Sequence, residues 1–318
     1  MPAHEKIVVI TKKTALEELI ERHSSREQAR FYVESRGASF GEYEAAHDAY
    51  QAARRDLARD MPSGARVQWI ERDFLPTFTF GSNDLVVTLG PDGLVVNAAK
   101  YLNGQSVVAF NPDLTRVDGV LLPFPIYQAK WVLAKAQAGE GSVEHLTMAE
   151  ARLNDGQNLL ALNDFFIGRN NHASARYRVN LGIESEEQLS SGILVSTGAG
   201  STGWMRSVLT GAGRILEDFA PSPEVSSASQ VAQNDFRFGW SEARLRFSVR
   251  EPFVSKTSGA RLVFGEIEND EEIEIVSLMP QDGVILSDGV IEDALEFNAG
   301  AIARVGVAAR KLHLVTRV

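Results

Sequence analysis

The hydrophobic pattern of the sequence changes near residue 125, and this change limits the folds open to the chain more than any other feature. Upstream of it, short β-branched runs alternate with helical segments; the runs include "KIVVI" at 6–10, "DLVVTLG" at 84–90 and "SVVAF" at 106–110. Buried runs separated by helices are typical of a parallel sheet with helices on its faces. We therefore expect residues 1–125 to form an α/β domain with a Rossmann-like parallel sheet.

Downstream of residue 125, apolar and polar residues alternate one by one. The stretch 175–181 alternates Ala, Tyr, Val and Leu with Arg and Asn, and 245–250 alternates Leu, Phe and Val with Arg and Ser. A period of two predicts strands with one solvated face. Residues 126–318 are therefore expected to form a β-rich, mostly antiparallel domain, whose last segment is free to return to the first domain.

The helical segments are less evenly distributed than the strands. One helix is predicted after Thr14, with Gly37 as its stop, and a second over 42–61. In the downstream half we expect one helix near 204–217. The stretch "APSPEVSSASQ" at 220–230 is predicted to be a mobile surface loop, because it is rich in Ser and Pro.

Composition excludes several function classes. Lys and Arg number 32 and Asp and Glu 42, for a net charge of −10, which argues against a broad nucleic-acid or membrane surface. The chain has no cysteine, so thiol catalysis and Cys-ligated zinc are excluded, and its six histidines are spaced too irregularly for a His-based metal site. "MPAHEKIVVITKK" lacks the apolar core of a signal peptide, so we expect a cytoplasmic protein without a metal site of its own.

A glycine turn, Gly90-Pro91-Asp92-Gly93, leads from the 84–90 strand directly into a helix. Such turns present backbone N–H groups to anionic oxygens. The charge of Asp92 would repel a phosphate, so this carboxylate is better suited to accept a proton from a hydroxyl or to hold Mg²⁺ indirectly. The alternative is an ordinary turn in which Asp92 is the N-cap of the helix.

A second glycine turn lies in "ILVSTGAGSTGW" at 193–204, where Gly198, Gly200 and Gly203 form a G-x-G-x-x-G pattern. This pattern occurs in dinucleotide-binding Rossmann units, but here it lies in the β-rich half and lacks a convincing βαβ context. The remaining alternative from local chemistry is a Gly-rich turn in which Ser201 caps a helix.

A third stretch, "LLALNDFFIGRN" at 159–170, is a predicted strand interrupted by Asn163 and Asp164. Polar side chains in an apolar strand cost free energy unless they are hydrogen-bonded. The pair either marks a strand end or bulge, or binds a ribose diol, since a carboxylate accepts from two hydroxyls and an amide both donates and accepts.

These three stretches, in this order, resemble the motifs of the NAD kinase family, whose superfamily includes the diacylglycerol and sphingosine kinases. Gly90–Gly93 is similar to the family's Gly-Gly-Asp-Gly turn, and Asn163-Asp164 is similar to its Asn-Glu motif. Thr197–Trp204 is similar to its Thr-x-x-Gly-Ser-Thr-Ala-Tyr motif. "FSVREP" at 247–252 and "LEFNAGAIA" at 295–303 resemble the mitochondrial-type branch.

The resemblance implies an NAD kinase, which phosphorylates the adenosine-ribose 2′-hydroxyl of NAD(H) to give NADP(H). Asp92 would be the general base, and Gly90 and Gly93 would let the backbone approach the phosphates of the donor. The implied NAD-binding residues are Asn163, Asp164, Gly200, Ser201, Thr202 and Trp204. Trp204 would lie beside NAD rather than pack the start of its helix against the sheet.

The resemblance also implies ATP with Mg²⁺ as the phosphate donor, with polyphosphate as the alternative, and a homodimer. The chain contains no Gly-Lys pair and hence no Walker A motif. Lys12, at the end of the first predicted strand, is a candidate donor-binding cation or an ordinary solvated lysine.

Two departures from the family pattern keep other functions open. Pro91 replaces a Gly and lacks an N–H donor, and Leu94 replaces the Thr that usually follows the turn. The chain could therefore be a non-catalytic or weakly active dinucleotide-binding homologue. A lipid or sugar kinase of the same superfamily is a further alternative, which the Asn163-Asp164 and Trp204 matches disfavour.

Overall fold

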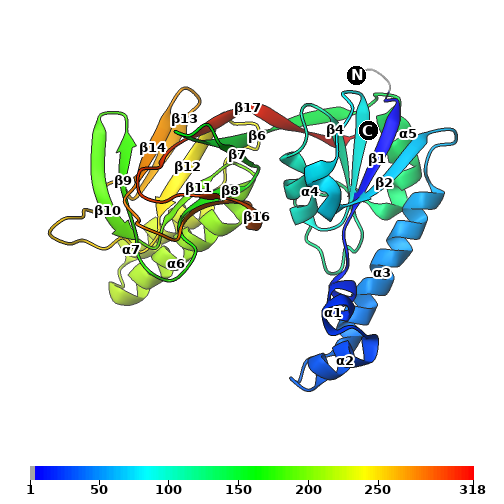
Figure 1. Cartoon of the computed structure of the whole chain (residues 1–318), viewed down its shortest axis with the longest axis horizontal. Helices are drawn as coiled ribbons and strands as arrows, with labels where there is room; N and C mark the ends of the chain where they lie inside the picture. The colour runs from blue at the N-terminus through cyan, green and yellow to red at the C-terminus, as the bar shows by residue number, and fades with distance from the viewer. Residues whose placement is uncertain (1–3) are drawn as a thin grey trace. The chain divides into compact units, whose positions relative to one another are not determined.

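The computed structural model describes residues 4–318 (Figure 1), so the first three residues of the predicted N-terminal domain lie outside it. The chain forms two compact units. Unit 1 comprises the chain up to Glu144 together with Leu312–Val318, and unit 2 comprises His145–Lys311. The change in hydrophobic pattern predicts a domain boundary at residue 125. In the structure, the boundary lies after Glu144, and the last seven residues belong to unit 1.

Unit 1 is built on a parallel sheet. Its strands are β1 (Lys6–Thr11), β2 (Arg66–Glu71), β3 (Asp84–Leu89), β4 (Ser106–Asn111) and the short β5 (Phe124–Pro125). The order is β2-β1-β3-β4, β5 pairs with β4, and every one of these pairings is parallel. His313 and Leu314, near the end of β17 (Ile302–Arg317), add a further parallel partner to β4. Every residue of β3 and β4 is buried, as their β-branched runs predict.

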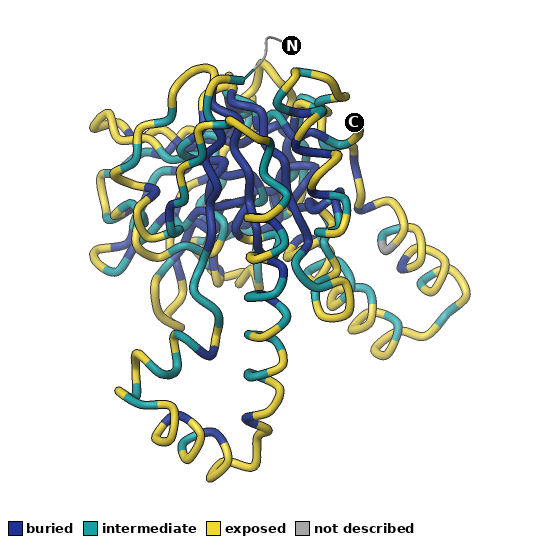
Figure 2. The backbone as a smooth tube through the Cα atoms, turned by 90° about the vertical axis from the view of Figure 1, so that its right-hand side faces the viewer, coloured by how far each residue is buried: buried dark blue, intermediate teal, exposed yellow. Residues whose placement is uncertain are grey.

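The helices of unit 1 connect these strands. They are α1 (Ala15–His23), α2 (Arg26–Glu34), α3 (Phe40–Arg59), α4 (Asp92–Ala99) and α5 (Ala129–Gln137), with short 3₁₀ helices at Arg72–Thr77 and Ile126–Gln128. The α1 and α2 helices project beyond the sheet with the start of α3 (Figure 1), and their exposure contrasts with the buried strands (Figure 2).

The prediction of one continuous helix after Thr14 is wrong. The helix breaks at Ser24, which has a left-handed backbone with φ of 64°, and a new helix begins after Ser25. The Ser25 side chain accepts a hydrogen bond from the N–H of Gln28 and so caps α2. The left-handed Ser24 and the capping hydroxyl of Ser25 thus favour a new helix start over continuation of the first helix.

Unit 2 is a β-sandwich with two sheets. One has the order β13-β12-β11-β8-β15-β16 and the other contains β10-β9-β14-β17 with β6 and β7. The first sheet comprises β8 (Asp164–Arg169), β11 (Ile193–Ser196), β12 (Arg244–Val249), β13 (Phe264–Glu268), β15 (Gly283–Ser287) and β16 (Val290–Glu296). The second comprises β6 (Ser142–Leu153), β7 (Asn158–Ala161), β9 (Ala175–Leu181), β10 (Glu184–Ser190), β14 (Glu272–Ser277) and β17, of which β6 and β17 contribute residues to both units.

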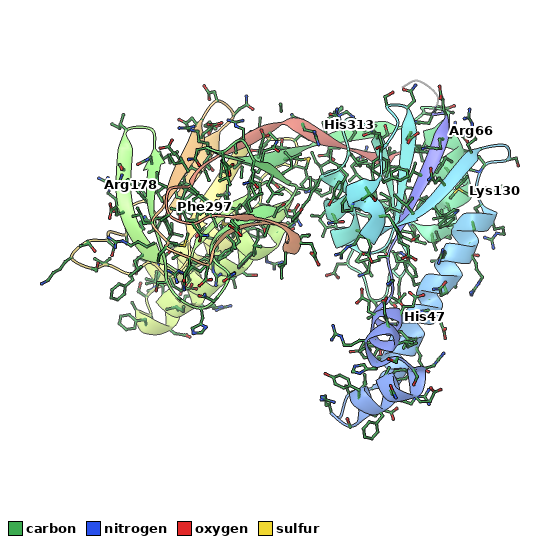
Figure 3. All side chains as sticks on the ribbon, in the orientation of Figure 1. His47, Arg66, Lys130, Arg178, Phe297 and His313 are labelled. Atoms are coloured by element: carbon green, nitrogen blue, oxygen red, sulfur yellow. The ribbon has the colours of Figure 1, made fainter. Side chains whose placement is uncertain are left out.

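The core of unit 2 lies between these two sheets. Phe165 and Phe247 from one sheet pack with Tyr177 from the other in a single hydrophobic cluster, which also contains Phe297 (Figure 3). Neighbouring strands in the first sheet pair antiparallel, as do β9, β10, β14 and the first part of β17. The predicted combination of a parallel α/β region and an antiparallel β-rich region is therefore confirmed.

Unit 2 has one more helix than predicted. A 3₁₀ turn at Gly200–Thr202 leads into α6 (Trp204–Phe219), and α7 (Pro223–Asn234) follows it. The prediction of a loop over 220–230 is wrong, because Ser222 caps α7 by accepting from the N–H of Val225 and Pro223 occupies the first turn. Proline is well tolerated there, since the first N–H groups of a helix have no partner within it.

Candidate functional site

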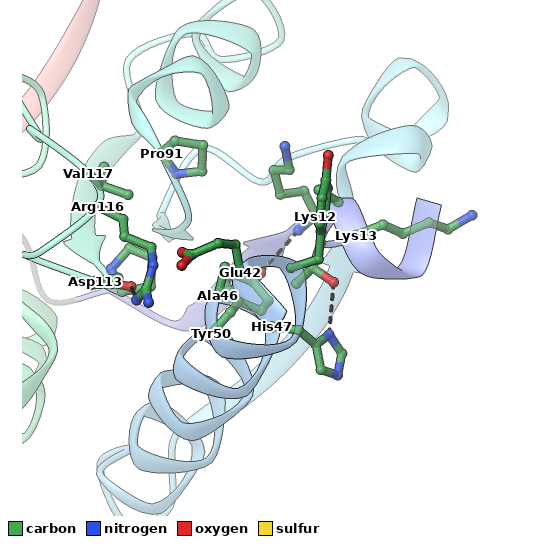
Figure 4. Close-up of a pocket in the computed structure, with 14 residues that line it drawn as sticks. Lys12, Lys13, Glu42, Ala46, His47, Tyr50, Pro91, Asp113, Arg116 and Val117 are labelled. Carbon is green, nitrogen blue, oxygen red and sulfur yellow. Dashed lines mark hydrogen bonds and ion pairs between the residues drawn. The ribbon is translucent and has the colours of Figure 1, made fainter. Parts of the chain in front are cut away.

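The carboxyl ends of the parallel strands of unit 1 bring the predicted donor-site residues to one edge. The β1 strand has β2 on one side and β3 on the other, so the connections diverge there. The crevice at such a switch point is the usual ligand site of open α/β sheets. Lys12 follows β1 directly and Gly90 follows β3 directly, and Lys12 and Pro91 line the same pocket (Figure 4).

The Gly90–Gly93 turn holds its carboxylate by a long-range contact. Pro91 is the N-cap of α4, and Asp92 is its first residue, so the alternative in which Asp92 is the N-cap is wrong. Asp92 Oδ1 instead accepts a hydrogen bond of 2.6 Å from the N–H of Leu121. This bond fixes the orientation of the carboxylate and leaves its second oxygen free of hydrogen bonds from residues 4–318.

The two glycines of this turn differ in their surroundings. A Cβ at Gly90 would lie 2.9 Å from Leu94 Cδ2, so the start of α4 packs closely on this position. A Cβ at Gly93 would meet nothing within 4 Å, and the residue is exposed. Packing therefore explains Gly90, whereas open space at Gly93 is what a closely approaching ligand requires.

Tyr50 on α3 ties the ends of β1 and β3 together. Its hydroxyl donates to the Leu89 carbonyl at 3.1 Å and accepts from the N–H of Lys12 at 3.2 Å. Burial raises the pKa of Tyr50, so the phenol remains a neutral donor. Tyr50 thereby fixes the backbone of Lys12, whose ammonium has no ion-pair or hydrogen-bond partner in the described part of the chain.

The Asn163–Asp164 pair of unit 2 lies at the start of β8, where Asp288 accepts hydrogen bonds from its backbone. The Asp288 carboxylate accepts hydrogen bonds from the N–H groups of Leu162 (3.0 Å), Asn163 (2.7 Å) and Asp164 (3.1 Å). Sequence reasoning missed Asp288. The available signal was the Asp288-Gly289 turn after β15, in which Asp288 has a φ of 56°.

The carboxyl group of Asp164 is buried without a donor. Only 9% of the residue is exposed, and its side chain receives no hydrogen bond from residues 4–318. Burial, and secondly the charge of Asp288, raise the pKa of Asp164 to about 7. The half-buried side-chain amide of Asn163 also has no partner among these residues. Two adjacent polar groups thus offer unused hydrogen-bonding capacity, which suits a hydroxyl-bearing ligand.

Two of the three glycines of the 198–203 turn are required by packing. A Cβ at Gly198 would lie 2.3 Å from the Gly239 carbonyl oxygen, and one at Gly200 would lie 2.1 Å from the Asn163 carbonyl oxygen. The preceding strand, β11, pairs antiparallel with both β8 and β12, so no βαβ unit exists here. The Rossmann interpretation of G-x-G-x-x-G is therefore wrong.

Ser201 and Thr202 occupy the 3₁₀ turn before α6. Ser201 is buried, and its Oγ donates to the Gly198 carbonyl at 2.7 Å. The N-cap of α6 is Gly203, without a side-chain cap bond, so the alternative in which Ser201 caps the helix is wrong. Thr202 is half-buried, and its hydroxyl lies 3.5 Å from the Ala199 carbonyl. Gly200, Ser201 and Thr202 remain predictions as ligand-binding residues.

Trp204 lies on the surface of unit 2 in an aromatic stack. It is 37% exposed and so lies outside the buried core, but its contact with Phe166 of β8 is the packing of helix start on sheet that the alternative expects. Its ring stacks on Phe166 at a centroid distance of 5.7 Å, and the Arg250 guanidinium lies 5.1 Å from its centroid. Phe166 is two residues after Asp164 on β8 and so shares its face of the sheet. Sequence reasoning missed both Phe166 and Arg250 as supports of this ring.

No protein-family model and no curated protein matches the sequence. Among solved structures, the chain is similar to yeast NADH kinase in complex with NADH, with 15% identity, 99% of this chain and 84% of that chain covered, and a TM-score of 0.60. Similarity at this level of identity establishes the fold. The fold implied by the resemblance to NAD kinases is thus confirmed along nearly the whole chain.

In residues 4–318, no group of three or more His, Asp or Glu side chains could hold a metal ion. Over the same residues, no helix combines the length and apolar character needed to cross a membrane.

Proposed function

We propose that this protein is an NAD(H) kinase, which transfers the terminal phosphoryl group of a nucleoside triphosphate to the adenosine-ribose 2′-hydroxyl. The observation that carries the proposal is the NADH kinase fold along 99% of the chain. The motif resemblance supports it independently, because two of its three parts carry side-chain oxygens or amides without a partner in residues 4–318, at Asp92 and at the Asn163–Asp164 pair.

In this proposal, Asp92 is the general base. Its free carboxylate oxygen accepts the proton of the 2′-hydroxyl while the N–H of Leu121 holds the other oxygen. The ribose oxygen then forms a bond to the γ-phosphorus, the bond from that phosphorus to the β,γ-bridging oxygen breaks, and the nucleoside diphosphate leaves. A fixed carboxylate lowers the barrier because no reorientation precedes the proton transfer.

The acceptor site in this proposal lies on unit 2. Asp164 and Asn163 would hydrogen-bond ribose hydroxyls or adenine edges, and Trp204 would contact a ring of NAD(H). Gly200, Ser201 and Thr202 would contribute backbone and hydroxyl groups at the turn. The support is that the side chains of Asp164 and Asn163 have no hydrogen-bond partner within residues 4–318 and that Trp204 is 37% exposed.

Mg²⁺ fits this site only as an ion carried by the donor. The described residues offer no three-ligand cluster, and Mg²⁺ typically binds kinases through one or two carboxylates together with substrate phosphates. When bound, it would neutralise charge on those phosphates. Lys12 would add a protein cation, and Gly90 and Gly93 would admit the phosphate chain.

A second candidate function is a dinucleotide-binding protein without catalytic activity. Pro91 favours it, because a proline at the turn offers no N–H to a phosphate. Cytoplasmic location and a homodimeric state, both implied at the sequence level, remain predictions.

The test of the proposal measures binding and turnover on the same preparation. NADH binding is followed by calorimetry, and NADP(H) formation is followed after addition of Mg²⁺ and ATP with NAD or NADH. The kinase proposal expects both signals. NADH binding without NADP(H) formation would instead support the non-catalytic candidate, and loss of both would remove the dinucleotide assignment.

A further inference from the structure

The connection from β4 to β5 in unit 1, residues 112–123, carries the backbone N–H that holds Asp92. Asn111, the last residue of β4, pairs in parallel with Pro125, the last residue of β5. The connection therefore leaves the sheet and returns to the neighbouring strand, and residues 112–123 form no helix or strand of their own. The position of the Leu121 N–H must therefore be fixed by contacts other than regular secondary structure.

The side-chain amide of Asn111 binds the backbone of this connection with both of its ends. Its Oδ1 accepts from the N–H of Asp113 at 2.9 Å, and its Nδ2 donates to the carbonyl of Val117 at 2.9 Å. Asn111 is buried, so water does not replace these partners when they are lost. The amide therefore ties together two points of the first half of the connection.

Gly119 brings the second half of the connection against the same amide. Its backbone is left-handed, with φ of 68°, and a Cβ there would lie 2.6 Å from Nδ2 of Asn111. Glycine meets both conditions without strain. The N–H of Leu122 donates to the carbonyl of Gly119 at 3.1 Å, and Leu121, inside this turn, donates its N–H to Asp92 Oδ1 at 2.6 Å.

We propose that Asn111 is a positioning residue for Asp92, because its amide fixes the connection from which the Leu121 N–H reaches the carboxylate. This inference rests on the proposed function, in which Asp92 is the general base. An irregular segment moves when its internal hydrogen bonds are lost. Without the amide, the Leu121 N–H leaves Asp92 and the carboxylate takes other orientations, which slows proton transfer and leaves substrate affinity unchanged.

Gln105 offers a matched control at the opposite end of β4. It is also a buried amide that binds two backbone groups: its Oε1 accepts from the N–H of Asn103 at 2.6 Å, and its Nε2 donates to the carbonyl of Gly81 at 3.1 Å. Gln105→Ala and Asn111→Ala therefore remove the same kinds of hydrogen bond, and both should lower the melting temperature. Only Asn111→Ala should act on Asp92.

The first experiment requires no turnover. Hydrogen exchange of the Leu121 N–H is measured by NMR on the full chain, in the wild type, Asn111→Ala and Gln105→Ala. We expect exchange to be at least about tenfold faster in Asn111→Ala than in Gln105→Ala, since the contact to Asp92 then opens without unfolding of the sheet. Equal rates in the two variants, or a slower rate in Asn111→Ala, would overturn the inference.

The second experiment measures NADP(H) formation with Asn111→Ala in two backgrounds. In the wild-type background we expect kcat to fall by about 10- to 100-fold, with KM for ATP and NADH changed by less than about twofold, while Gln105→Ala keeps the wild-type kcat. In the Asp92→Asn background we expect no further fall, because the group that Asn111 positions is already lost. An unchanged kcat, or an equal fall in both backgrounds, would overturn the inference.

The inference and the proposed function fail in different ways. If NADP(H) forms but Asn111→Ala changes neither the exchange of the Leu121 N–H nor kcat more than Gln105→Ala does, the inference is wrong and the kinase proposal stands. If the exchange responds to Asn111→Ala but no NADP(H) forms, Asn111 still positions the carboxylate and the kinase proposal is wrong.

Gly119→Ala replaces Asn111→Ala in both experiments if the latter does not fold. Its methyl group would press on the amide of Asn111 and displace the second half of the connection. Gly104→Ala is the matched control, because Gly104 is also left-handed, with φ of 92°, but a Cβ there would come no closer than 3.8 Å to His313 Cε1. We expect Gly119→Ala, and not Gly104→Ala, to speed exchange at Leu121 and to lower kcat; equal effects of the two would overturn the inference.

Discussion

The two glycine-bearing turns of this protein look alike in sequence and differ in structure. The 198–203 turn of unit 2 needs Gly198 and Gly200 for packing, because a Cβ on either one would lie only 2.3 Å or 2.1 Å from a backbone oxygen. The Gly90–Gly93 turn of unit 1 ends in Gly93, whose missing side chain leaves open space. A glycine pattern alone therefore does not identify a phosphate site; the neighbours of each glycine do.

The carboxylates near the two turns differ in burial and in hydrogen bonding. Asp92 is half-buried and hydrogen-bonded by the Leu121 N–H. Asp164 is nine-tenths buried with no donor, and burial raises its pKa to about 7. The first is prepared to accept a proton, and the second is prepared to exchange hydrogen bonds with a ligand.

The largest effect is expected from Asp92→Asn in unit 1. The amide keeps the size of the side chain, and its oxygen can still accept from Leu121, so folding should be retained. Turnover should fall by about 10²- to 10⁴-fold, since a general base is lost. The control is Asp118→Asn, an exposed carboxylate in the same segment as Leu121. Wild-type turnover in Asp92→Asn would remove Asp92 from the mechanism.

The next largest effect is expected in the stability of the folded protein, which should depend on pH because Asp164 titrates. Its pKa is raised in the folded state, to about 7 from 3.8, so protonation favours the fold. The resulting stabilisation is fully present below pH 3.8 and is lost as the pH rises to 7, by up to about 4 kcal/mol.

Asp164→Asn removes this titration and is the control for it. Thermal unfolding at pH 4 to 7.5 should show a steeper decline for the wild type than for Asp164→Asn. Parallel stability profiles for the two proteins would show that Asp164 does not titrate in this range.

Alanine substitution of one glycine in each turn tests the packing comparison directly. Gly200→Ala should destabilise unit 2 by about 2–3 kcal/mol, because its Cβ would force the Asn163 backbone to move. Gly93→Ala should change stability by less than about 0.5 kcal/mol, as expected for an open surface position. Equal melting temperatures for the two variants would show that packing does not distinguish the two turns.

Trp204→Ala should weaken NADH binding and leave the stability of the protein nearly unchanged. Loss of an aromatic stacking face should weaken NADH binding by about 5- to 150-fold, with little effect on ATP. The melting temperature should change little, since Trp204 is 37% exposed. NADH should quench the fluorescence of Trp204, and Trp131→Phe, an exposed tryptophan of unit 1, is the control. Quenching that survives intact in Trp204→Phe would end this assignment.

The smallest effect is expected from Pro91→Gly. Glycine restores a backbone N–H at the donor turn, but it also increases the flexibility of the unfolded chain. We expect the KM for ATP to fall roughly three- to tenfold, since the new hydrogen bond is to a charged group. An unchanged KM would show that the missing N–H does not limit donor binding.

The sequence predicted those features of the fold that depend on residues close together in the chain. The β-branched runs of β1, β3 and β4 predict a parallel sheet, and the spacing of Gly90 and Gly93 predicts the turn after β3. Two predictions of helix boundaries were wrong, at Ser24 and at Ser222. Serine occurs both in loops and at helix caps, so the sequence alone did not distinguish the two.

The parts that could not be predicted depend on contacts distant in sequence. Asp288 bonds to Asn163 across 125 residues, and Tyr50 reaches the Leu89 carbonyl across 39. Neither pairing leaves a periodic signal, because each requires the folded sheet to bring its partners together. The contacts of Trp204 with Phe166 and Arg250 likewise join residues far apart in the sequence.

The most direct test of the account is the chemical identity of the product. Full-length protein is incubated with Mg²⁺, ATP and NADH, and the products are analysed by ³¹P NMR together with the amount of ADP formed. The account predicts one new phosphomonoester at the 2′-position of the adenosine ribose, in equal amount to ADP. ADP formation without a phosphorylated dinucleotide, or no reaction under conditions in which both nucleotides bind, would contradict it.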